Sequence, residues 1–137
     1  MASILKVNTL TGVTAAGTIA VTAEGGSTTT NLQQGLAKAW TNAEQIGTNA
    51  VRDSFNGSSI TDNATGDLSI TVTSAMGNIN YAHVGTAGQG ANSLINISQN
   101  FDVAAPTTTV SRYQMAYVND TLIDVASINI GLLGDLA

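Results

Sequence analysis

The side chains that could do chemistry are few and widely spread along this chain. His83 is the single histidine, and it lies in the alternating run NYAHVG, where we expect a packed or surface position on a strand. Glu24 and Glu44 are the only glutamates, and their separate loop-like regions do not favour a carboxylate pair for glycoside hydrolysis. No serine stands in a G-x-S-x-G nucleophile elbow. The sequence therefore predicts a protein that is not an enzyme.

The run DNATGD is the nearest approach to a metal-binding loop. Asp62, Asn63, Thr65 and Asp67 supply the oxygen atoms that Ca²⁺ prefers. The run lacks the every-second-residue ligands and the terminal glutamate of an EF-hand. Turns in which Asn and Asp side chains bond to their own backbone explain the same residues, so both interpretations stay open, with the turn favoured. We predict no cofactor and no resident metal.

Charge and composition limit the classes of partner. Only 9% of the 137 residues are charged, and the net charge is −5. The basic residues Lys6, Lys38, Arg52 and Arg112 are scattered, so they form no stripe that could neutralise nucleic-acid phosphates. The sequence contains no run of about 18 apolar residues, so we expect no transmembrane helix. A surface with so few charges suits a protein that is covered by copies of itself or by partner subunits.

The chain divides into a predicted N-terminal arm, residues 1–35, and a body, residues 36–137. The arm holds two β-prone runs, SILKVNTL and TIAVTA, followed by EGGSTTTN, which we interpret as a flexible connection. NLQQGLAKAW is expected to form one or two helical turns with Asn31 as the cap and an interruption at Gly35.

The body is predicted to be all-β, a β-sandwich of possibly jelly-roll-like kind. In LSITVT, Leu68, Ile70 and Val72 alternate with polar residues, and the preceding FNGSSITDNATGD is interpreted as tight turns. We expect Trp40 and two phenylalanines, Phe55 and Phe101, to be the largest core residues. The predicted strands lie at about 37–42, 48–55, 67–74, 79–86, 93–101, 109–118 and 124–134.

Six short motifs follow one another along the chain: KAW (38–40), AVRDSFN (50–56), SSITDNATGD (58–67), AM (75–76), NY (80–81) and GDLA (134–137). Their order and spacing resemble a module of small fibre proteins of tailed bacteriophages, especially marine and cyanobacterial ones. The resemblance covers about the last hundred residues and departs from the family pattern after Trp40, where TNAEQIGT replaces a strand that contains an aromatic residue.

This resemblance implies a virion structural protein of tail-fibre type that assembles in the host cytoplasm. Its N-terminal arm would attach to other virion proteins, such as an adaptor, a nozzle or the capsid, and its sandwich would contact a host-surface glycan or protein. Two alternatives stay open. One is a decoration or cement protein of the capsid. The other is a non-viral carbohydrate-binding module, for which Trp40, Tyr81, Tyr113 and Tyr117 are possible stacking platforms.

Low charge, a small apolar core and β-prone arm segments without an obvious partner predict a homotrimer, because assembly would cover strand edges that are otherwise open. We expect five arm residues to contact other subunits or an adaptor: Ile4, Val7, Leu10, Ile19 and Val21. Loops present binding groups, so the host-contact candidates lie in two of them: Gln89 and Asn92, and Asp120 and Asp124. Weak binding at one site would be raised by threefold presentation.

Overall fold

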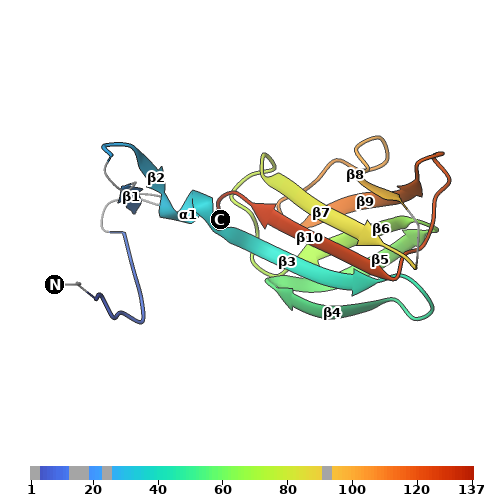
Figure 1. Cartoon of the computed structure of the whole chain (residues 1–137), viewed down its shortest axis with the longest axis horizontal. Helices are drawn as coiled ribbons and strands as arrows, with labels where there is room; N and C mark the ends of the chain where they lie inside the picture. Colours follow the sequence, from blue (N-terminus) through green and yellow to red (C-terminus); the bar gives the residue numbers. More distant parts are fainter. Residues whose placement is uncertain (1–3, 13–18, 23–25, 91–93) are drawn as a thin grey trace.

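The body of the chain is a sandwich of two four-stranded antiparallel sheets, which confirms the predicted fold class (Figure 1). The structure is a computed structural model that describes residues 4–12, 19–22, 26–90 and 94–137. Sheet I has the order β4-β3-β10-β7 and sheet II the order β5-β6-β9-β8. The strands of sheet I are β4 (Ala50–Phe55), β3 (Ala37–Glu44), β10 (Ser127–Leu133) and β7 (Ala82–Gly88), and those of sheet II are β5 (Gly57–Ala64), β6 (Asp67–Val72), β9 (Val110–Tyr117) and β8 (Ile95–Gln99).

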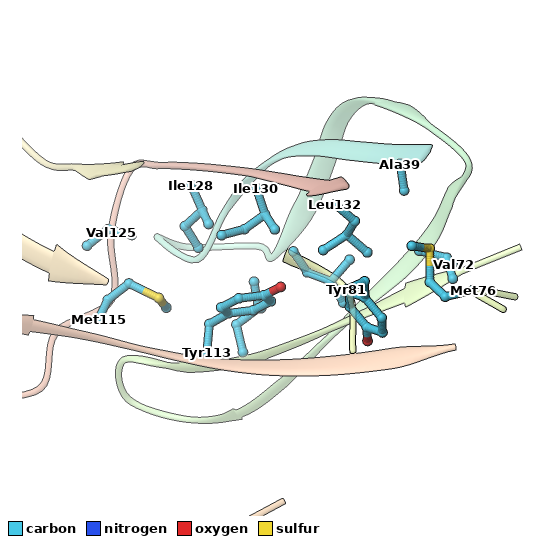
Figure 2. Close-up of a cluster of buried hydrophobic side chains, with 12 residues drawn as sticks. Ala39, Val72, Met76, Tyr81, Tyr113, Met115, Val125, Ile128, Ile130 and Leu132 are labelled. Carbon is cyan, nitrogen blue, oxygen red and sulfur yellow. The ribbon is translucent and has the colours of Figure 1, made fainter. Parts of the chain in front are cut away.

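The core lies between the sheets and follows the alternation of the sequence. Every second residue of β10, namely Ile128, Ile130 and Leu132, is buried, and β6 buries Leu68, Ile70 and Val72 in the same way. Alternation of this kind sends one face of each strand into the core, because successive side chains of a strand point to opposite faces. Figure 2 shows the side chains of β10 on one side of this core and those of β9 on the other.

The prediction that Trp40, Phe55 and Phe101 fill the core is wrong. Their exposed fractions are 39%, 53% and 60%. On β3 the inward positions belong to the small residues around Trp40, including Ala39 and Ala43, so Trp40 must point outward. The aromatic bulk of the core comes instead from two buried tyrosines, Tyr81 and Tyr113 (Figure 2).

Strand β5 was not predicted, because its sequence was interpreted as turns. Ile60 is the one large apolar residue of β5, and most of the strand is exposed at the edge of sheet II, so no period-2 pattern marks it. The turn before it is real: Asn56 has a left-handed φ of 57° and takes the chain from β4 in sheet I to β5 in sheet II. Its side-chain amide donates to the carbonyls of Lys38 and Ser74, and its oxygen accepts from the Ser74 N–H at 2.7 Å.

The arm lies beyond one end of the sandwich (Figure 1). Strands β1 (Ala20–Thr22) and β2 (Thr29–Asn31) form a hairpin, so the predicted flexible connection contains a strand. Helix α1 (Leu32–Gly35) is the expected short helix, and the Asn31 side chain accepts from the Gln34 N–H at 3.1 Å, as a cap should. Residues 4–12 contain no helix or strand, so the β-structure predicted for SILKVNTL is not found there.

The hairpin between β5 and β6 depends on Gly66. This residue has a φ of +64°, and a Cβ built on it would lie 2.5 Å from the Met115 carbonyl oxygen and 2.7 Å from the Ile123 nitrogen. The close approach lets the Gly66 carbonyl accept from the Met115 N–H at 2.8 Å. Its own N–H donates to the Asp124 carboxylate at 2.7 Å. The turn is thereby joined to the segment before β10.

We predict that Gly66→Ala destabilises the protein by roughly 3 kcal/mol, because it adds a backbone clash to the cost of a left-handed φ. Gly47→Ala is the matched control, since Gly47 has a φ of +76° with nothing within 4 Å of a Cβ. It should cost about 1 kcal/mol. Urea unfolding of both variants measures the difference, and equal losses would show that the approach to Met115 and Ile123 is unimportant.

Candidate contact surfaces

Four of the five arm residues expected to contact other subunits have exposed side chains. Ile4 is 77% exposed, and Val7, Leu10 and Val21 are each at least half exposed. Ile19 is intermediate, and its carbonyl accepts from the Leu32 N–H at 2.8 Å. The exposed apolar side chains of the arm, of which Val21 lies on the hairpin, are available to a partner, and their contact with one stays a prediction.

The C-terminal end of β7, which Gln89 follows, and the loop between β9 and β10 lie at the end of the sandwich opposite to the arm (Figure 1). Asp120 is exposed at a turn with a φ of 64°, whereas the Asp124 carboxylate accepts from the Gly66 N–H and so holds the fold together. The Gln89 side-chain oxygen is buried, with no partner among the described residues. Asn92 lies outside the described residues. Of the three candidates that the structure describes, Gln89, Asp120 and Asp124, no two are joined by a hydrogen bond.

The two carboxylates of the DNATGD run, those of Asp62 and Asp67, accept hydrogen bonds from protein groups. The Asp62 carboxylate accepts from the side-chain amides of Gln45 at 3.3 Å and Asn49 at 2.7 Å. The run itself forms the end of β5 and the hairpin to β6, which accounts for its composition without an ion. Among the described residues, no group of three or more histidine, aspartate or glutamate side chains could hold a metal ion.

Asp67 forms an ion pair with Arg112 across the β6–β9 pair. The Arg112 Nε and Nη2 atoms each lie 2.7 Å from one carboxylate oxygen, and the amides of Asn63 and Asn100 also donate to it. The hydrogen bonds from Arg112 lower the pKa of Asp67 below its ordinary 3.8, against the opposing effect of burial. A bidentate pair of this kind fixes both partners in direction as well as distance.

His83 lies on β7, a strand position as predicted, and points between the sheets. Its Nδ1 is 2.6 Å from the Tyr113 hydroxyl, and its ring centre is 4.7 Å from that of Tyr81. Burial lowers the pKa of His83 below its ordinary 6.5. A cavity of about 350 Å³ opens beside it and is also lined by Gln99 and Tyr113. This arrangement fixes the ring by packing and a hydrogen bond.

The outer face of sheet I carries a row of apolar residues that was not predicted from the sequence. Phe55 lies opposite Trp40, Trp40 opposite Gly131, and Gly131 opposite Val84. We call these four residues the aromatic row. Trp40, Phe55 and Val84 are exposed, and a groove of about 310 Å³ lies over Gly131 between Trp40 and Val84.

A polar row runs beside the aromatic row, two residues along each strand. Asp53 lies opposite Asn42, Asn42 opposite Asn129, and Asn129 opposite Thr86. We call these four residues the amide row. The Asn42 Nδ2 donates to the Asn129 Oδ1 at 2.6 Å, and the Asn129 Nδ2 is 3.4 Å from the Thr86 hydroxyl. The outward positions could have been found from the alternation of β3 and β10, but their neighbours depend on the pairing of distant strands.

Comparisons with protein families, with curated proteins and with solved structures found no match. Within the described part of the chain, no helix has the length and apolar character needed to cross a membrane.

We predict that Asp67→Asn destabilises the protein and that the loss depends on pH. Because the folded pKa of Asp67 lies below 3.8, its contribution is fully present above 3.8 and disappears as the pH falls through the lower folded pKa. The difference in unfolding midpoint between native protein and variant should therefore shrink in acid. Glu44→Gln, which removes the more exposed pair with Arg52, is the control and should change the midpoint much less. An equal loss in both variants would contradict this reasoning.

We predict a second pH dependence from His83, the only histidine. Since burial depresses its folded pKa, the unfolded chain binds the proton more readily, and stability falls as the pH drops below 6.5. No other side chain has an ordinary pKa between pH 5 and 7.5. His83→Gln should therefore abolish the fall in Tm between pH 7.5 and 5.5. If His83→Gln shows the same decrease in Tm as the native protein, the decrease must come from groups other than His83.

Proposed function

We propose that this chain is a virion structural protein of tail-fibre type, a homotrimer that attaches through its arm and contacts the host surface through its sandwich. The observation that carries the proposal is the arm itself, which lies outside the sandwich, contains a β-hairpin and carries exposed apolar side chains. The order of the motifs that resemble phage fibre proteins supports the viral context.

The arm needs a partner to be stable. A lone two-stranded hairpin is marginal in water, and β1–β2 has three residues in each strand. Val21 of β1 and Leu36 after α1 are both at least half exposed, so the hairpin has little apolar contact of its own. Copies of the same chain, or another virion protein, would cover these side chains. A threefold arrangement of arms would do so with one repeated contact.

The junction between arm and body is held by polar contacts. The buried Lys38 side chain donates to the carbonyls of Gln33 and Leu36, and the Gln34 amide donates to the Asp135 carboxylate at 2.7 Å. These bonds join α1 to the start of β3 and to the end of the chain. The arm is thereby placed at the end of the sandwich away from the loops that hold Gln89 and Asp120, which supports a division between attachment and host contact (Figure 1).

A capsid decoration protein is the alternative, because it would also dock by an arm. Gold-labelled antibody against the chain distinguishes the two on intact particles. Labelling at the tail supports the fibre assignment, whereas labelling confined to the capsid faces would replace it with the decoration role.

We predict a trimer in solution that depends on the arm. Deleting residues 1–30 should give a folded monomer, because it removes the exposed apolar side chains of the arm and most of the hairpin. Val21→Lys should weaken the trimer in the full chain, since it places a charge in the expected contact. Val103→Lys is the matched control, because Val103 is similarly exposed on the body. Light scattering at micromolar concentration measures each state, and a monomeric full chain or a trimer that survives the deletion would contradict the proposal.

A further inference from the structure

The outer face of sheet I leaves large aromatic side chains in water. Trp40 is the only tryptophan and Phe55 is one of two phenylalanines, yet neither is used in the core. Burying such a side chain is worth about 1.5–3 kcal/mol, so their exposure gives up stability that the chain could use. Because Trp40 and Phe55 are cross-strand neighbours, the exposed apolar surface is continuous and not a scatter of single side chains.

The groove beside Trp40 exists because residue 131 is a glycine. A Cβ at Gly131 would lie 2.9 Å from the Val84 Cγ2 atom and would stand between the Trp40 and Val84 side chains. With glycine there, the backbone of β10 forms the floor of a groove of about 310 Å³. This volume is at the lower end of the range for small-ligand sites.

The amide row supplies hydrogen-bonding groups at one side of this groove. Asn42, Asn129 and Thr86 already hold one another in place through their side chains, so these groups are oriented before a ligand arrives. An asparagine side chain has two donors and an acceptor with two lone pairs. Asn129 uses both donors, on the hydroxyls of Thr86 and Ser127, whereas Asn42 uses one donor, on Asn129, and so keeps one N–H and its Oδ1 for a ligand. Asp53 adds a carboxylate beside Asn42.

We propose that this face binds a neutral saccharide, with a sugar ring stacked on Trp40 above Gly131 and its hydroxyl groups bonded to the amide row. The inference deepens the host-contact role proposed above and rests on it. Positions two residues apart on a strand are separated by about 6.8 Å, which is the distance from the apolar floor to the amide row. A ring that lies on the aromatic row therefore places hydroxyl groups at one edge within reach of the amides.

The charges of the face favour a neutral sugar over other ligands. The two rows contain one charged residue, Asp53, and the nearest cation along β4, Arg52, is already paired with Glu44. An anionic glycan or a phosphate would therefore meet a carboxylate without a free cation to offset it. A purely apolar partner would cover the amide row and leave the second side-chain N–H and the Oδ1 of Asn42 unsatisfied, at a cost of about 1–3 kcal/mol for each group. Sugar hydroxyls donate and accept, so they match both rows.

The test uses the full chain on an array of neutral and sialylated oligosaccharides, followed by calorimetric titration of a bound neutral sugar. We expect binding to a neutral glycan, lost by at least tenfold in Trp40→Ala and in Gly131→Ala. Gly131→Ala fills the groove with one methyl group and keeps Trp40. Phe101→Ala is the matched control, because it removes an exposed aromatic residue from outside these rows, and it should bind within twofold of the native chain.

Thermal unfolding and light scattering of the same variants separate this inference from the proposed assembly. Native Tm and a native trimer in Trp40→Ala, together with lost sugar binding, support the saccharide site. Absence of binding to any neutral glycan, binding to sialylated glycans alone, or unchanged binding by Trp40→Ala would overturn it. A trimer lost in Trp40→Ala would assign the face to contact between copies and would also overturn it. If no sugar binds but the trimer still depends on the arm, the saccharide inference is wrong and the assembly proposal stands.

Discussion

The register of β10 between β3 and β7 is the constraint on which the rest of sheet I depends. Ile128, Ile130 and Leu132 must point into the core, because each is almost fully removed from water. A slip of one residue would send these three side chains to the outer face and bring Asn129 and Gly131 into the core. With about 1.5–3 kcal/mol for each large apolar side chain, the correct register is strongly preferred.

That register also decides what the outer face displays. Once Ile130 points inward, Gly131 must point outward, and the pairing of β10 puts it between Trp40 and Val84. The same alternation sets Asn129 between Asn42 and Thr86. The outer rows are therefore a consequence of the core pattern, and the chain can change the residues that face outward without changing those that hold the sheets together. This separation suits a surface whose binding properties are set independently of the fold.

How far the sequence predicts the fold depends on how much each strand buries. Strand β10 and strand β6 bury alternate large apolar residues, and their existence and inward faces could be predicted from period-2 patterns. Strand β5 lies at an edge and has one large apolar residue, Ile60, so its Asn, Asp and Ser residues suggested turns. The position of Trp40 was misjudged because a large aromatic residue usually favours burial, whereas the small size of Ala39 and Ala43 gave no sign that they face the core.

The candidate surfaces were harder to predict than the strands. Asn42 and Asn129 are far apart in the sequence, and only the β3–β10 pairing makes them neighbours. The pairing of Asp67 with Arg112 likewise requires β6 beside β9, which no local pattern indicates. One of the predicted host-contact residues, Asp124, has a structural role instead, because its carboxylate accepts a hydrogen bond from the Gly66 N–H. The local sequence pattern predicts the face of the sheet on which a side chain lies. The residues that it contacts on that face depend on the strand order of the whole sheet.

The low content of charged residues affects both the arm and the outer face of sheet I. Exposed charges keep a protein soluble as a single chain, and only 9% of these residues carry one. Two groups of exposed apolar side chains, those of the arm and those of the aromatic row, lie at different parts of the molecule (Figure 1). An assembly through the arm would remove the first from water and hold several copies of the second close together. Several weak contacts held in this way bind a surface far more tightly than one alone, provided that the spacing allows them to engage together. A modest groove over Gly131 is then sufficient, because affinity would come from the number of copies and specificity from the amide row.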